Sequence, residues 1–278
     1  MIALASRFRF ALAVALIACL AGCGGGGGGG GSTSGTSGPA SPISPIVTAN
    51  GIAMFTLTSH QTGQTYPITV WEPPNAATGT APAVIYVLDA DYRFATLQPV
   101  LQQSGVRATL VGVGDLGTDR RQVDFLQPGD DPYYLFLTQE LAAVIEAHFR
   151  VDPAHRVLSG HSSGGLFCMY AFFKQTPANR PYSAYICADG SYWQQPDLVL
   201  AAEAAMYTAN QGHDLPITLV MGADQFGNLA YMDPLYQVVL ARKYPGLNIS
   251  EHTYALGHLP MDAPFFNDAL AIIFPAKN

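Results

Sequence analysis

The sequence predicts an α/β fold, with a mostly parallel twisted sheet, helices on both faces and an antiparallel N-terminal hairpin. Continuous apolar runs such as residues 83–88 and 108–113 are typical of strands buried on both faces. Helical stretches with apolar faces alternate with these runs, as in α/β proteins with a parallel sheet. The chain has 278 residues, which is enough for one such domain after an N-terminal segment is set aside.

The N-terminal segment has the pattern of an export signal. Residues 1–22 combine a basic start with a short apolar run, and they predict a signal peptide. The stretch Leu20-Ala21-Gly22-Cys23 resembles the lipobox of bacterial lipoproteins, which implies cleavage before Cys23 and lipid attachment there. We therefore expect an exported protein, lipid-anchored and facing the periplasm or cell surface. The alternative is an ordinary signal peptide on a freely secreted protein.

After the signal, composition divides the chain into a tether and a domain. Residues 23–47 contain an unbroken glycine run followed by Ser, Thr and Pro, which predicts a flexible tether. Residues 48–278 form the predicted domain. Its expected strands are 54–59, 65–72, 83–88, 108–113, 156–159, 184–189, 217–222 and 248–255. Its expected helices are 95–103, 132–149, 165–174, 197–207, 233–244 and 263–274. A long polar loop, 114–131, is expected to be functional or mobile.

Charge and cysteine content exclude several classes of partner. The chain has 13 Lys and Arg against 20 Asp and Glu; removing Arg7 and Arg9 leaves 11 against 20, a net charge of −9. The absence of a basic cluster argues against nucleic acid and anionic lipid surfaces as partners. Cys168 and Cys187 either form a disulfide or remain two inert buried thiols, and their spacing fits no zinc site. We expect no metal and no organic cofactor.

The motif Gly160-His161-Ser162-Ser163-Gly164 lies between a predicted strand and a predicted helix. A strand, a tight Gly-x-Ser-x-Gly turn and a helix together form a nucleophile elbow, which exposes the serine hydroxyl above the sheet. The turn forces the serine into a strained backbone conformation, and glycine at both flanks avoids clashes. The motif therefore predicts Ser162 as a nucleophile, with the positive end of the following helix favouring an oxyanion.

A serine nucleophile needs a base and an orienting acid. Of the seven histidines, only His258 follows the terminal strand within a glycine-containing loop, which makes it the candidate base. Asp224 follows another strand and gives the chain order Ser, Asp, His found in α/β hydrolases. Asp189 also lies at a strand end and is the competing acid. The further options are Asp233 and Asp262.

Two backbone amides are expected to bind the oxyanion, and nearby aromatic side chains are expected to line the substrate pocket. The amide of Ser163 follows the nucleophile, and that of Asp91 lies in the loop after strand 83–88. The aromatic candidates for the pocket are Tyr92, Phe94, Tyr192 and Trp193.

From residue 54 onward the chain resembles the enterochelin-esterase-like "putative esterase" family of α/β hydrolases, which also includes feruloyl esterases and mycolyl transferases. The similar stretches are 86–91, 140–150, 160–167, 185–193 and 257–258. By this resemblance Asp91 occupies the position of the family's oxyanion donor, although Ala90 replaces a glycine. The family's Ser-Pro-Ser appears here as Asp189-Gly190-Ser191, which places an additional carboxylate near the site. Some relatives use a Ser–His pair with little help from an acid.

Together these features predict a serine carboxylic ester hydrolase that forms an acyl-enzyme on a small, siderophore-type or feruloyl-type ester. Acyl transfer to another alcohol is the alternative within enzymes. A ligand-binding lipoprotein on a hydrolase scaffold is the alternative outside them, because fold does not fix function.

Overall fold

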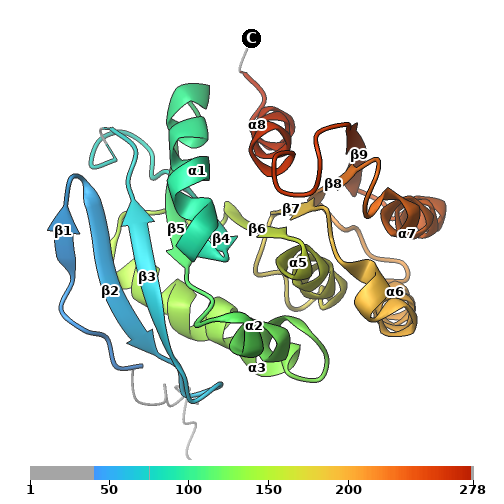
Figure 1. Cartoon of the computed structure of the whole chain (residues 1–278), viewed down its shortest axis with the longest axis horizontal. Helices are drawn as coiled ribbons and strands as arrows, with labels where there is room; N and C mark the ends of the chain where they lie inside the picture. Colours follow the sequence, from blue (N-terminus) through green and yellow to red (C-terminus); the bar gives the residue numbers. More distant parts are fainter. Residues whose placement is uncertain (1–40, 75, 277–278) are drawn as a thin grey trace, which may run out of the picture. The chain divides into compact units, whose positions relative to one another are not determined.

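A nine-stranded sheet is the centre of the computed structural model, which describes residues 41–74 and 76–276 (Figure 1). The strands of this described part are β1 Val47–Ala49, β2 Ile52–Thr58, β3 Thr65–Trp71, β4 Ala83–Leu88, β5 Ala108–Val113, β6 Arg156–His161, β7 Ala184–Ala188, β8 Thr218–Asp224 and β9 Asn248–Tyr254. Their order is β1-β2-β3-β5-β4-β6-β7-β8-β9. The pairs β1–β2, β2–β3 and β3–β5 are antiparallel and all others are parallel, which confirms the predicted sheet.

Helices cover both faces of this sheet (Figure 1). They are α1 Ala90–Ser104, α2 Thr118–Phe125, α3 Asp130–Leu135, a π-helix Phe136–Leu141, α4 Ala142–His148, α5 Ser163–Phe173, a 3₁₀ turn Tyr192–Gln194, α6 Pro196–Ala209, α7 Leu229–Arg242 and α8 Asp262–Ile273. α1 and α8 pack on one face, and α2 to α7 lie on the other. Within the described residues, none of these helices has the length and apolar character needed to cross a membrane.

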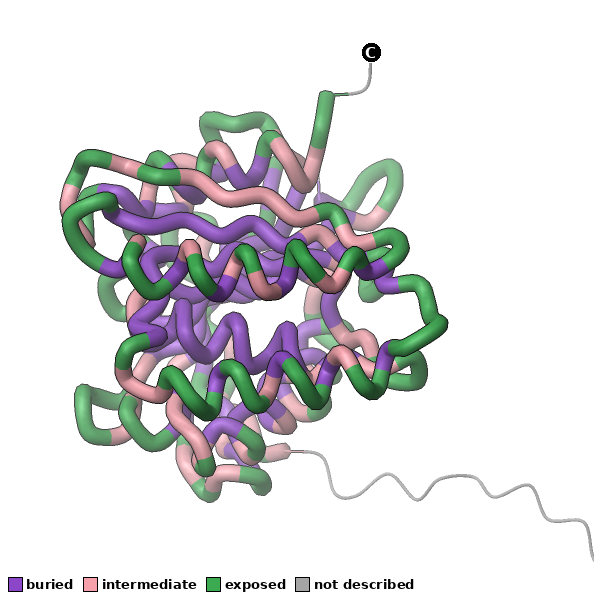
Figure 2. Tube along the Cα trace, turned by 90° about the vertical axis from the view of Figure 1, so that its right-hand side faces the viewer, coloured by how far each residue is buried: buried purple, intermediate pink, exposed green. Residues whose placement is uncertain are grey.

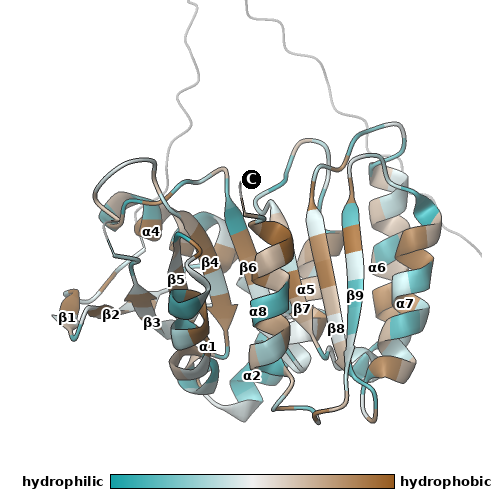
Figure 3. Ribbon diagram, turned by 90° about the horizontal axis from the view of Figure 1, so that it is seen from above, coloured by the Kyte–Doolittle hydropathy of each residue, from teal (hydrophilic) through white to brown (hydrophobic). Residues whose placement is uncertain are grey.

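Burial follows this layering. Strands β4 and β5 are buried at every position, as their continuous apolar runs predict, whereas the edge strand β9 is partly exposed along its length. Figure 3 shows the corresponding change from apolar inner strands to the more polar β9. Figure 2 shows buried segments in the interior of the domain and exposed ones on its outside. All residues of α5 are buried, because this helix lies between the sheet and its neighbours α2 and α6. The elbow helix is therefore held on all sides.

Two segments differ from the sequence-based expectation. The predicted loop 114–131 contains α2, whose Phe125 packs in the core beside Tyr133 and Phe167. The end of the predicted tether, residues 42–47, lies along β2: Thr58 donates its amide to the Pro42 carbonyl, and Ser44 donates to Thr56. The folded part of the chain thus begins before residue 48. The signal peptide, Cys23 and the tether up to residue 40 lie outside the described residues, so the lipid anchor stays a prediction.

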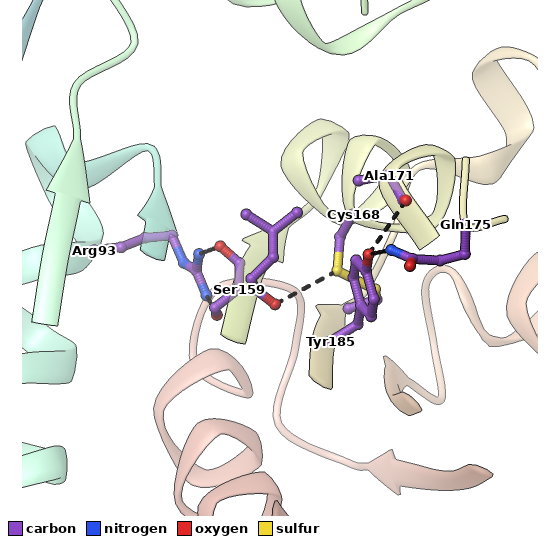
Figure 4. Close-up of a disulfide and its surroundings, with 8 residues drawn as sticks. Arg93, Ser159, Cys168, Ala171, Gln175 and Tyr185 are labelled. Atoms are coloured by element: carbon purple, nitrogen blue, oxygen red, sulfur yellow. Dashed lines mark hydrogen bonds between the residues drawn. A yellow bond between two sulfur atoms is a disulfide. The ribbon is translucent and has the colours of Figure 1, made fainter. Parts of the chain in front are cut away.

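The two cysteines of the domain are joined in a disulfide, one of the two alternatives left open by the sequence (Figure 4). Cys168 comes from α5 and Cys187 from β7, and both are fully buried. Beside them Tyr185 donates to the Ala171 carbonyl at 3.3 Å and accepts a hydrogen bond from the Gln175 amide. The disulfide links α5, the helix that follows Ser162, to β7, the strand that leads to Asp189.

Candidate active site

The sequence around Ser162 forms the predicted elbow. β6 ends at His161, α5 begins at Ser163, and Ser162 between them has φ 61° and ψ −122°. A Cβ atom at Gly160 would lie 2.0 Å from the carbonyl oxygen of Gly164, so only glycine is accommodated there. Positive φ at a serine costs about 1–3 kcal/mol, and here the surrounding buried strand and helix maintain it. The turn leaves Ser162 partly exposed while its neighbours are buried.

His258 and Asp189 form the hydrogen-bonded pair expected of a base and its orienting acid. His258 Nδ1 lies 2.5 Å from Asp189 Oδ2. The carboxylate is fully buried, whereas the imidazole is 41% exposed. Because Nδ1 faces a carboxylate, it carries the proton, and Nε2 is left to accept one. Such a pair fixes the tautomer of the ring at the carboxyl edge of the sheet.

The expectation that Asp224 orients His258 is therefore wrong, and the competing residue Asp189 takes that place. Asp224 Oδ1 instead accepts the amide hydrogen of Gly257 at 3.0 Å, and its own amide donates to Asp189 Oδ1 at 3.0 Å. The reason is local backbone geometry. Asp189 follows β7 with φ 40°, and that turn brings its carboxylate to His258. Asp224 contacts Asp189 rather than His258, and its carboxylate accepts the Gly257 amide hydrogen in the loop that carries His258.

The other two candidate acids have different partners. Asp262 opens α8 and pairs with the fully buried Arg93 through two hydrogen bonds of 2.8 Å. Burial acts to raise the Asp262 pKa, but the adjacent guanidinium outweighs it and lowers the pKa. Arg93 also donates to the Ser159 carbonyl at 3.0 Å, below the elbow (Figure 4). Asp233 lies on α7 and accepts a hydrogen bond from Gln237.

The predicted oxyanion donors lie at the N-termini of two neighbouring helices. β4 and β6 are adjacent parallel strands, so α1 and α5 both begin at the same edge of the sheet. Asp91 and Ser163 are in the first turns of these helices, where amides have no partner within the helix. Neither amide donates to another group in the described part of the chain. Asp91 was expected in a loop before a helix at 95–103, but α1 begins at Ala90 and includes it. The catalytic role of both amides belongs to the proposed function.

A salt bridge not foreseen from the sequence supports this edge. Arg121 of α2 binds both carboxylate oxygens of Asp89, at 2.7 and 2.8 Å, and lies 3.3 Å from the His161 carbonyl oxygen. Burial raises the Asp89 pKa, and Arg121 opposes that shift. Asp89 precedes α1 in the left-handed conformation, with φ 56°. Arg121 therefore joins α2, in the segment predicted to be a loop, to the turn between β4 and α1; only the presence of arginine in 114–131 hinted at this.

His161 forms a hydrogen bond with the loop that carries the candidate base His258. Its Nε2 donates to the His258 carbonyl oxygen at 2.8 Å, and the two rings lie 4.4 Å apart between centroids. Burial lowers the His161 pKa to about 4, so the ring is neutral at neutral pH. A neutral ring with its proton on Nε2 matches the observed hydrogen bond. His161 thus positions His258, while the sequence motif by itself marked only the serine.

Protonation of His161 should destabilise the protein in acid. Between its ordinary pKa of 6.5 and the folded value of about 4, the unfolded chain binds a proton that the folded protein does not. The contribution of neutral His161 to the free energy of unfolding is therefore complete above pH 6.5. It decreases by about 3 kcal/mol in total as the pH falls from there to about 4. Urea unfolding at neutral and acid pH should show a larger loss for wild type than for His161→Gln. Parallel losses would contradict this.

The aromatic pocket candidates divide into two pairs. Tyr92 and Trp193 are about half exposed, as a pocket wall requires, and the Tyr92 hydroxyl donates to Asp89 Oδ2 at 3.0 Å. Phe94 and Tyr192 are buried in the core, so the expectation that they line the pocket is wrong. Ser191, on the other hand, is close to the nucleophile, with its Oγ 3.3 Å from Ser162 Oγ.

One grouping in the described residues has donor atoms spaced for a metal ion. His161, Asp189 and His258 each offer an atom within 4.8 Å of the others. However, His161 Nε2 donates to the His258 carbonyl and His258 Nδ1 pairs with Asp189. These contacts are those of a hydrogen-bonded base and acid, and they occupy one ring nitrogen of each histidine.

Comparison with known proteins assigns this arrangement to a family. Residues 59–225, more than half of the chain, match the family model described as "Putative esterase". The chain belongs to the putative esterase family. It is accordingly a serine hydrolase that acts on carboxylic esters, and the match includes the elbow and Asp189.

Individual relatives of this esterase are distant in sequence. It is 23% identical to the ferri-bacillibactin esterase BesA of Bacillus subtilis over 210 residues, which are 64% of this chain and 71% of BesA. Among solved structures, the BES protein from Bacillus cereus has a TM-score of 0.72 at 20% identity, covering 83% of this chain and 98% of that one. An IroE-like serine hydrolase from Shewanella oneidensis has a TM-score of 0.68 at 22% identity, covering 80% of each chain. These structures share the α/β-hydrolase fold.

Proposed function

We propose that this esterase hydrolyses a small-molecule carboxylic ester through an acyl-enzyme, with Ser162, His258 and Asp189 as its triad. The contact between His258 Nδ1 and Asp189 Oδ2, beside an elbow serine, carries this proposal. The names of the relatives, which include an esterase of ferri-bacillibactin, make siderophore esters one substrate class to test.

In the first half-reaction the Ser162 oxygen attacks the ester carbonyl carbon, and its proton passes to His258 Nε2. The carbonyl oxygen becomes an oxyanion, which the amides of Ser163 and Asp91 hold by hydrogen bonds. Asp189 stabilises the imidazolium that forms, through the Nδ1 contact. The C–O bond to the alcohol then breaks, and His258 returns the proton to the departing oxygen.

In the second half-reaction water attacks the acyl carbon, and His258 takes its proton. The bond between that carbon and the Ser162 oxygen then breaks, His258 gives the proton to the Ser162 oxygen, and the carboxylic acid leaves. In the structure the Ser162 hydroxyl contacts Ser191 rather than His258. Rotation about the Cα–Cβ bond of Ser162 re-aims its oxygen; catalytic hydrogen bonds often tighten only when substrate is bound. The exposed imidazole gives water direct access to the acyl group.

A pre-steady-state burst tests this mechanism. With a para-nitrophenyl ester, the account predicts rapid release of about one equivalent of nitrophenol per active site, followed by slower turnover. Intact-mass measurement of the acid-quenched protein should show the added acyl group. When acylation limits the rate, no acyl-enzyme accumulates, so the test also uses a para-nitrophenyl carbamate, whose carbamoyl-enzyme is hydrolysed slowly. Release of nitrophenol from the carbamate without any carbamoylated protein would contradict the proposal.

A further inference from the structure

Three of the most exposed apolar side chains of the described residues surround the site. Phe226 is 80% exposed, Leu259 is 65% exposed and Trp193 is 52% exposed. Leu259 directly follows His258, and Phe226 lies in the turn after Asp224. All three come from loops at the carboxyl ends of β7, β8 and the segment after β9.

Hydrogen bonds fix each of these loops to the catalytic groups. Next to Trp193, Gln194 donates to Ser163 Oγ at 2.9 Å. In the turn that carries Phe226, Asn228 donates to the Asp189 carbonyl at 2.8 Å. Leu259 is placed by the bond between His161 and the His258 carbonyl. The three apolar residues, which we call the apolar rim (Trp193, Phe226 and Leu259), therefore lie on loops that are hydrogen-bonded to Ser163, Asp189 and His161.

The basic side chains near the carboxyl ends of the parallel strands, the edge of the sheet that carries Ser162, are already paired with carboxylates. The basic residues there are Arg93, Arg120 and Arg121, paired with Asp262, Asp124 and Asp89. The other described basic residues lie near the amino ends of the strands or the C-terminal ends of the helices, which is the opposite edge of the sheet. They are Arg107, Arg150, Arg156, Lys174, Arg180, Arg242 and Lys243. No lysine or arginine among the described residues at this edge lacks a carboxylate partner.

Negative charge at the edge is not neutralised in this way. Asp91 and Asp119 are exposed and Asp115 is partly exposed, and none of them forms an ion pair with a described residue. Asp91 lies at the oxyanion turn, and its Oδ2 accepts the Asp115 amide at 2.7 Å. Asp115 interacts electrostatically with Arg121, but that guanidinium is occupied by Asp89. An anionic substrate would meet repulsion here.

We propose that the esterase selects esters without negative charge, whose aryl or alkyl group rests on the apolar rim. This inference depends on the proposed function, because it concerns the same site. Aromatic and aliphatic surface around the nucleophile favours an apolar group on the substrate. Unpaired carboxylates disfavour an anionic one. The exposed carboxylates therefore favour an uncharged ester over any siderophore complex that carries negative charge.

Matched esters with the same leaving group test the charge preference. We would compare para-nitrophenyl phenylpropionate with its derivative bearing a carboxylate at the para position of the phenyl ring. The neutral ester should have a kcat/KM about tenfold higher or more at low ionic strength, and the ratio should shrink as salt screens the exposed carboxylates. Equal values, or a preference for the carboxylate, would overturn the inference.

Two sets of variants locate the cause. Asp115→Asn combined with Asp119→Asn should narrow the neutral-to-anionic ratio several-fold, whereas Asp214→Asn, an exposed acid at the opposite edge, should leave it unchanged. Trp193→Ala and Phe226→Ala should each raise KM for the phenylpropionate more than for para-nitrophenyl acetate. The control Leu240→Ala, near the C-terminal end of α7, should not. An unchanged ratio and unchanged KM in these variants would also overturn it.

Para-nitrophenyl acetate distinguishes failure of the substrate inference from failure of the proposed function. Its acyl group is small and uncharged, so its turnover reports the catalytic machinery without the charge and acyl contacts that the other two esters compare. Turnover of the acetate without charge selection defeats only the substrate inference. Absence of turnover for every ester, including the acetate, defeats the proposed function and the substrate inference with it.

Discussion

Ser162→Ala is expected to lower kcat for a para-nitrophenyl ester by about 10⁴- to 10⁶-fold, because it removes the only atom that forms the acyl bond. Backbone amides still bind the oxyanion, so a small residual activity remains. The matched control is Ser191→Ala, which removes the hydroxyl 3.3 Å away but no atom of the proposed bond. That variant should retain activity within about tenfold.

The Ser162 result requires that the fold is unchanged. Alanine adopts the same backbone conformation at φ 61°, so the thermal unfolding midpoint of Ser162→Ala should stay close to that of wild type. Equal activity of Ser162→Ala and wild type, in preparations free of other esterases, would eliminate Ser162 as the nucleophile.

Asp189→Asn is expected to lower kcat by about 10⁴-fold, the second large effect. If the asparagine amide nitrogen faces His258, it donates a hydrogen bond to Nδ1 and favours the tautomer with the proton on Nε2. Nε2 can then no longer accept the proton of Ser162. The asparagine oxygen can still accept the Asp224 amide, which limits the structural damage. Steady-state kinetics on the purified variant, with unfolding measured in parallel, checks this expectation.

Asp224→Asn is the matched control for Asp189→Asn. Its amide oxygen can still accept the Gly257 hydrogen, so the histidine loop keeps its hydrogen bond. We expect a decrease in kcat of less than about tenfold. If Asp224→Asn lost more activity than Asp189→Asn, the assignment of the acid from geometry would be reversed.

The sequence predicted the inner strands closely for a physical reason. The runs 83–88 and 108–113 are apolar at nearly every position, because both faces of the parallel strands are covered, and they match β4 and β5 in full. The polar segment 118–125 carries no such signal. Its helix α2 depends on contacts far along the chain: Arg121 with Asp89, and Phe125 with Phe167.

The site shows the same division between local and distant information. The elbow is a local motif, so Ser162 and its flanking glycines were predictable from spacing alone. The acid was not, because Asp189 and Asp224 both lie at the ends of neighbouring strands of the sheet. Which carboxylate reaches His258 depends on the turn at Asp189, with φ 40°, and no residue pattern specifies that turn. The replacement of the family's serine by Asp189 was the available clue.

The most direct test of the account is the site and rate of covalent labelling by a fluorophosphonate, followed by intact-mass measurement and peptide mapping. The account predicts one adduct per chain, located on Ser162 and absent from Ser162→Ala. It also predicts that labelling is much slower in Asp189→Asn than in Asp224→Asn, since only Asp189 contacts His258 Nδ1. An adduct on another residue, or equal labelling rates for the two aspartate variants, would contradict it.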